Sequence, residues 1–144
     1  MRKPLRVVID TNHIMSAILS SSGASAKLVD WIARDEGDLR LLISPPIWNE
    51  YLTVAAWLIP EPRKQEQERV FGVLSFQAEW ITPAIRLNVC RDVSDNRFLE
   101  CAVAASAHYL VTKNIHHFPP KEHEGVKIVR IRKFLEALER MAKK

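Results

Sequence analysis

The sequence lacks an apolar segment long enough to cross a membrane. Its longest stretch without Lys, Arg, Asp or Glu is residues 11–26, which is 16 residues long and contains five serines. A membrane-spanning helix needs about 20 mostly apolar residues. The apolar run after the basic start is interrupted at Arg6 and ends at Asp10, so we expect no export signal. We therefore expect a cytoplasmic protein without membrane contact.

Cysteine is also scarce. The two cysteines, Cys90 and Cys101, allow at most one disulfide and form no Cys-x-x-Cys pair. This argues against a disulfide-stabilised secreted scaffold and against a structural zinc site. We expect both thiols to be reduced.

The remaining composition is that of a globular protein. The chain has 144 residues, of which 47% are hydrophobic and 26% are charged. A chain of this length is expected to form one domain over residues 1–144. The formal net charge is +4, and residues 126–144 alone carry +5, with seven basic and two acidic side chains. This basic segment is either a nucleic-acid or acidic-partner contact or simply a solvated helix face.

Short β-branched runs alternate with amphipathic segments along the chain. The strand candidates are residues 5–9, 39–43, 109–112 and 126–130. The helix candidates are residues 24–35, 45–58, 62–78, 95–106 and 131–142. The only long loop is expected at residues 116–125. This order predicts an α/β three-layer sandwich with a central, mostly parallel sheet.

Three acidic residues are candidates for a site in this architecture. Asp10 directly follows the first strand, at the sheet edge where ligands bind in such folds. Alternatively, Asp10 or Asn12 caps the next helix. Glu50 borders the apolar face of its helix when the helix is projected at about 100° per residue. The alternative is an ordinary surface glutamate.

Asp95 is predicted to point inward from the first turn of its helix, because the apolar residues of that helix share its direction. Alternatively, it complements the helix dipole. Glu100 lies about 140° away around the same helix, beside Arg97, and is expected to be exposed.

If Asp10, Glu50 and Asp95 meet at one sheet edge, each pair repels by about 4 kcal/mol at an effective dielectric constant near 20. A divalent cation would neutralise them, and an all-oxygen set favours Mg²⁺ or Mn²⁺ over zinc. Such an ion also binds phosphate oxygens and activates water, which suits hydrolysis of phosphodiester bonds.

Four segments in order resemble the PIN domain, in its branch related to VapC ribonuclease toxins. They are residues 8–12 (VIDTN), Ser44-Pro45 followed by Glu50, residues 92–102 (DVSDNRFLECA) and residues 107–112 (AHYLVT). The match covers nearly the whole chain. One departure is Lys113-Asn114, where the family often carries a fourth acid, so weaker binding of a second metal is expected.

The resemblance implies a metal-dependent endoribonuclease that cleaves RNA and is the toxin of a toxin-antitoxin pair, blocked by a small antitoxin protein. It also implies roles for seven residues. Asp10, Glu50 and Asp95 become the catalytic metal ligands, while Asn12, Asp92, Thr112 and Asn114 become auxiliary or substrate-binding residues.

Other interpretations remain open. The chain could instead be a non-catalytic PIN-like module that binds RNA or protein. A receiver-type phosphoacceptor domain is disfavoured, because no Asp lies between Asp38 and Asp92. His13 is ambiguous. His116 and His117 could contact phosphate or metal, but we expect them to be a loop pair packed beside Phe118.

Aromatic residues on the long central helices suggest self-association. The positions of Tyr51, Trp57 and Phe71 lead us to expect a homodimer or a higher homo-oligomer. Two protomers could combine their basic segments into one RNA groove, and Lys143 and Lys144 are expected to contribute to RNA binding there.

Overall fold

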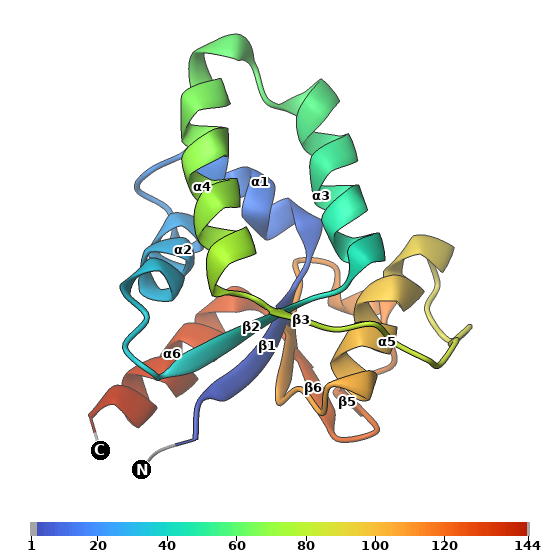
Figure 1. Cartoon of the computed structure of the whole chain (residues 1–144). Coiled ribbons are helices and arrows are strands. Elements are labelled where there is room, and N and C mark those ends of the chain that lie inside the picture. The colour runs from blue at the N-terminus through green and yellow to red at the C-terminus, as the bar shows by residue number, and fades with distance from the viewer. Residues whose placement is uncertain (1–2, 144) are drawn as a thin grey trace.

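A six-stranded sheet forms the centre of the computed structural model, which describes residues 3–143 (Figure 1). The strand order is β3-β2-β1-β4-β6-β5, and all neighbours pair in parallel except β5 with β6, which are antiparallel. The strands are β1 (Leu5–Ile9), β2 (Leu39–Ile43), β3 (Glu79–Trp80), β4 (Tyr109–Val111), β5 (Glu122–His123) and β6 (Val126–Val129).

Helices cover both faces of this sheet. They are α1 (Thr11–Leu19), α2 (Ala24–Arg34), α3 (Pro45–Leu58), α4 (Lys64–Gln77), α5 (Asn96–Ala104) and α6 (Ile131–Ala142). Short 3₁₀ turns are η1 (Glu61–Arg63), η2 (Val93–Asp95) and η3 (Ile115–His117). Helix α5 packs against β1, β2 and β4, whereas α2 and α6 contact each other and pack on β2 and β4 (Figure 1). The predicted three-layer α/β architecture is confirmed.

The local sequence explains the elements that hold the site. Val7, Val8 and Ile9 of β1 are fully buried, as expected for a parallel strand covered on both faces. Helix α3 begins after Ser44, whose hydroxyl accepts the N–H of Ile47 at 3.4 Å, and prolines occupy its first turn. Burial on both faces thus accounts for β1, and the serine cap with its following prolines accounts for the start of α3.

Two parts of the chain differ from the expectation. Residues 81–92 contain no helix or strand, although the only long loop was expected at residues 116–125. This segment lies against α5 and is anchored there by backbone N–H groups. Those of Val89 and Cys90 donate to Oδ1 of Asn96 at 3.0 and 2.9 Å.

The same segment overturns the expectation that Glu100 is exposed. Glu100 is only 3% exposed, and its carboxylate accepts the N–H of Leu87 at 2.8 Å. A helix projection locates a residue on its own helix but does not show a distant loop that covers that side. The prediction for Glu100 was wrong for this reason.

The aromatic residues behind the self-association hypothesis fall into two groups. Tyr51 and Phe71 belong to the hydrophobic core, whereas Trp57 is 72% exposed. Tyr51 and Phe71 therefore offer no contact surface, which corrects the residue basis of that hypothesis.

Both cysteines are buried and free, and burial raises the pKa of each thiol to about 12. Within residues 3–143, no helix combines the length and apolar character needed to traverse a bilayer.

Candidate active site

The sheet changes its winding direction at β1. From β1 the chain passes through α1 and α2 to β2, whereas β4 lies on the other side of β1 and is entered from α5 on the opposite face (Figure 1). Asp10 directly follows β1, and Thr112 directly follows β4. In open parallel sheets, ligands bind at such a switch point, outside the carboxyl ends of the strands.

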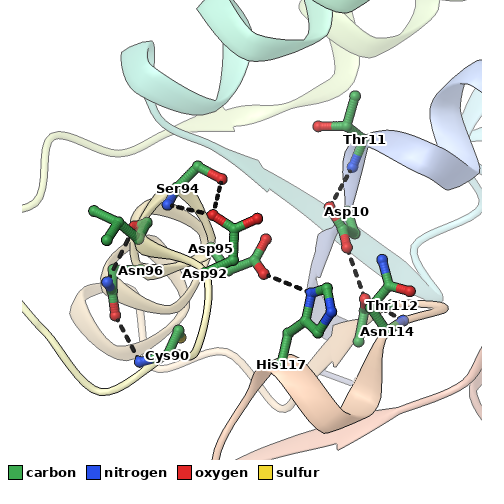
Figure 2. A network of polar contacts seen from close by, with 11 residues as sticks. Asp10, Thr11, Cys90, Asp92, Ser94, Asp95, Asn96, Thr112, Asn114 and His117 are labelled. Carbon is green, nitrogen blue, oxygen red and sulfur yellow. Dashed lines mark hydrogen bonds and ion pairs between the residues drawn. The ribbon is translucent and has the colours of Figure 1, made fainter.

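Asp10 is held in one orientation by two donors at this point. It is 5% exposed, its Oδ1 accepts the N–H of Thr11 at 2.8 Å, and its Oδ2 accepts the hydroxyl of Thr112 at 2.7 Å (Figure 2). The Thr112 hydroxyl in turn accepts the N–H of Asn114 at 3.0 Å. Asp10 is therefore the N-cap of α1, as one alternative had it, and it also lies at the carboxyl edge of the sheet. Its role as a ligand-binding residue stays a prediction.

Glu50 is brought to Asp10 by Thr11. The Thr11 hydroxyl donates to Oε2 of Glu50, which is half-buried on α3. The backbone of Thr11 holds one acid and its side chain holds the other. Thr11 was assigned no role from the sequence, although its position next to Asp10 indicated that it lies at the same edge of the sheet.

Asp95 lines the same cavity as Asp10 and Glu50, but among the described residues its potential ligand atoms group within 4.8 Å with those of Asp92 and His117, and that group does not include Asp10 or Glu50. Asp95 lies at the end of η2, is 8% exposed, and its Oδ2 is 3.2 Å from Nδ1 of His117 on η3 (Figure 2). Asp92 precedes η2, and its Oδ1 accepts the N–H and the hydroxyl of Ser94 at 3.1 and 2.9 Å. His117 therefore belongs to the site, contrary to the expected loop pair, whereas His116 is exposed.

These residues line one cavity of about 300 Å³. One wall is apolar and comes from α3. The lining consists of Asp10, Thr11, Asn12, Glu50, Val54, Trp57, Leu58, Asp92, Ser94, Asp95, Asn114 and His117. Of the seven site residues chosen from the sequence, only Thr112 is absent from this lining. It contributes indirectly, because its hydroxyl donates a hydrogen bond to Asp10.

The cavity is electrostatically unfavourable for its own carboxylates. Burial raises the pKa of Asp10 and of Glu50, although hydrogen bonds from Thr112 and Thr11 oppose this. Burial, followed by the charges of Asp10 and Asp92, raises the pKa of Asp95 to about 6.

Asp92 behaves differently, because its hydrogen bonds from Ser94 lower its pKa. Among the described residues, no lysine or arginine forms an ion pair with any of these four acids. The His117 imidazole, 3.2 Å from Asp95, is the basic group at hydrogen-bond distance. Partly buried carboxylates that no lysine or arginine neutralises fit a divalent cation.

His13 lies outside this group. It is 3% exposed, its Nδ1 is 3.0 Å from the Ser25 hydroxyl, and burial lowers its pKa to about 4. It is therefore a neutral histidine of the interior, which resolves the ambiguity of the sequence.

Comparison with known proteins agrees with the fold. The PIN domain family matches residues 6–116. The uncharacterized protein MJ1680 of Methanocaldococcus jannaschii is 32% identical over 108 residues, which are 72% of this chain and 67% of that protein. The crystal structure of VapBC2 from Rickettsia felis, bound to a DNA fragment from their promoter, has a similar fold. It has a TM-score of 0.56 and 15% identity, and the match covers 85% of this chain and 96% of that one. The chain belongs to the PIN domain family.

Proposed function

We propose that this protein is a metal-dependent endoribonuclease in which Asp10, Glu50 and Asp95 hold Mg²⁺ or Mn²⁺. The observation that carries the proposal is that these carboxylates, just after β1, on α3 and on η2, line one cavity in which no lysine or arginine of the described residues pairs with them. The basic side chain at hydrogen-bond distance is His117, whose Nδ1 is 3.2 Å from Oδ2 of Asp95. Membership of the PIN domain family, which typically contains metal-dependent nucleases, supports the same reaction class.

The residues around the ligands prepare the site for a phosphodiester. Thr11 and Thr112 fix Asp10, so that its carboxylate does not have to reorganise when it binds a cation. Asn12 and Asn114 line the cavity with amide groups that can donate hydrogen bonds to phosphate oxygens. A bound divalent cation supplies Lewis-acid stabilisation of charge and lowers the pKa of a water nucleophile.

The apolar wall of the cavity suits the bases of a nucleic-acid strand. Trp57 lines the cavity beside Val54 and Leu58 and remains 72% exposed. Aromatic side chains stack on bases of single strands with little dependence on sequence. We propose RNA as the substrate, with its backbone at the acidic group and a neighbouring base at Trp57.

The test is cleavage of a structured RNA by the wild type and by Asp10→Asn, each in Mn²⁺, Mg²⁺ or EDTA. We expect cleavage only by the wild type with a divalent ion. Equal products in every reaction would indicate a contaminating nuclease. If Mn²⁺ neither supports cleavage nor raises the melting temperature, the non-catalytic binding module becomes the better interpretation.

We further propose that the protein is the toxin of a toxin-antitoxin pair, that residues 1–144 form a single domain, and that it acts in the cytoplasm. The similarity of its fold to VapBC2 supports a small antitoxin partner. A short reading frame immediately upstream that overlaps this gene, and whose product copurifies with the protein and inhibits cleavage, would agree with this. If the product of no neighbouring gene inhibits cleavage, the proposal is contradicted.

Self-association into a homodimer or higher homo-oligomer stays a prediction. Exposed apolar side chains remain available for it, namely Leu52, Trp57, Leu58, Phe76 and Trp80. Light scattering at micromolar concentration tests it, and a monomer there would contradict it.

A further inference from the structure

His117 enters the acidic cavity from a different part of the chain than the carboxylates do. It lies on η3, beyond β4, and its imidazole is directed toward Asp95 (Figure 2). Its side chain is 39% exposed and lines the cavity. The ring is therefore accessible from the space that the acids surround.

The spacing of three side chains matches the size of a metal coordination shell. One potential ligand atom each from Asp92, Asp95 and His117 lies within 4.8 Å of the others. In an octahedral shell with bonds of about 2.1 Å, adjacent ligands are about 3.0 Å apart and opposite ligands about 4.2 Å apart. The 3.2 Å between His117 Nδ1 and Asp95 Oδ2 is close to the adjacent separation.

The donor types at this place differ from an all-oxygen site. Asn114 lines the cavity with a neutral amide, and His117 adds an imidazole nitrogen. Mg²⁺ prefers oxygen ligands, whereas first-row transition ions also bind imidazole well. A mixed set of carboxylates and one imidazole thus favours the transition ion.

We infer that His117 is a nitrogen ligand of the metal centre and that, with Asp92 and Asp95, it makes the site select a transition ion such as Mn²⁺ over Mg²⁺. The inference rests on the proposed metal dependence and specifies it. The competing explanation is that His117 only orients Asp95 through a hydrogen bond. His117→Asn separates the two, because asparagine can still donate a hydrogen bond but has no imidazole.

The experiment uses the full chain loaded with Mn²⁺, without RNA. Pulsed electron paramagnetic resonance detects the coupling between the electron spin of Mn²⁺ and a directly bound ¹⁴N nucleus. We expect this coupling in the wild type and in the matched control His116→Asn, because His116 is exposed and does not line the cavity. In His117→Asn the coupling should be absent.

Calorimetric titration gives a second readout. The ratio of Mn²⁺ affinity to Mg²⁺ affinity should fall by about tenfold or more in His117→Asn and stay unchanged in His116→Asn. A circular dichroism spectrum of the metal-free variant, compared with that of the wild type, shows whether the fold is retained.

Absence of nitrogen coupling in the wild type would overturn the inference, and so would an unchanged affinity ratio in a folded His117→Asn protein. Nuclease activity is measured separately. RNA cleavage without nitrogen coupling would leave the proposed function standing and remove the role of His117. Nitrogen coupling without RNA cleavage would support the role of His117 as a metal ligand and contradict the proposed nuclease function.

Discussion

Two groups of acids in this molecule differ in how their charge is compensated. Glu100, on α5, accepts a backbone N–H and forms ion pairs with Arg97 at 3.2 Å and Arg86 at 3.7 Å. Glu79, at the start of β3, is paired with Arg6 at 2.9 Å, and this partner lowers its pKa. In these places the chain supplies its own cations.

The acids at the carboxyl edge of the sheet receive hydroxyl and N–H donors but no arginine or lysine among the described residues. Their pKa values rise as a result of burial, and that of Asp95 rises to about 6. The chain places guanidinium groups beside Glu79 and Glu100, but it places none beside the carboxylates at this edge of the sheet among the described residues. The negative charge there is available to an external cation.

The largest expected effect comes from removing one charge from each group and measuring RNA cleavage. Glu50→Gln should reduce the rate by more than about 100-fold, because it removes a proposed metal ligand. Glu79→Gln, which breaks the Arg6 pair far from the cavity lining, should leave the rate within about threefold. Similar rates for the two variants would remove the functional distinction between the groups.

A stability measurement should show the next largest effect. Glu100→Gln should lower the free energy of unfolding by about 2–3 kcal/mol, because it leaves the Arg97 guanidinium, which is 27% exposed, without its partner. Urea denaturation measures this change. Glu66→Gln, which breaks an exposed pair with Arg69 on α4, is the control and should cost less than about 1 kcal/mol. Equal costs would contradict the structural role of Glu100.

The same chemical change at Asp95 should have the opposite sign. In the folded protein its pKa is about 6, above the unfolded value of about 3.9, so the folded state binds the extra proton between these pH values. The penalty of the buried charge is therefore fully present above pH 6 and disappears as the pH falls toward 4. Asp95→Asn should raise stability by about 1–3 kcal/mol at pH 7.5.

Thermal unfolding in EDTA, recorded from pH 7.5 to pH 4, checks this prediction. The difference between Asp95→Asn and the wild type should shrink steadily over that range. A variant that is less stable than the wild type at pH 7.5 would show that the Asp95 charge is compensated in a way that its contact with His117 does not explain.

The smallest expected effect lies in the basic segment, remote from the acids. Lys143→Ala should weaken RNA binding by about twofold and reduce the slope of log affinity against log salt by about 0.7. Fluorescence anisotropy at several salt concentrations measures both. Lys144, which was expected to act with it, lies outside the described residues. The same change in slope for Lys64→Ala, on α4, would show that the effect is not specific to this segment.

The sequence predicted the elements with strong local signals. The bounds of β1 and β2 were predicted correctly, because each is a short apolar run that ends at a polar residue. The bounds of α3 and α6 were also correct, since α3 has a serine cap with following prolines and α6 has one apolar stripe. Asp10 follows β1 and Glu50 lies on α3, which is why the sequence singled them out, and both line the cavity. Asp95 lines it too, but it ends η2 instead of opening the helix expected at residues 95–106.

What the sequence did not predict depends on contacts between distant segments. His117 reaches Asp95 across 22 positions from a 3₁₀ turn, and no periodic pattern marks the orientation of a turn. Glu100 is buried by residues 81–92, which have no regular structure. The two-residue strands β3 and β5 are too short to produce a recognisable alternation.

The position of Thr11 has a mechanical consequence. Its backbone N–H donates a hydrogen bond to the carboxylate of Asp10, just after β1, and its hydroxyl donates one to the carboxylate of Glu50 on α3. A shift of α3 relative to the sheet would thus be transmitted through this one residue to both acids.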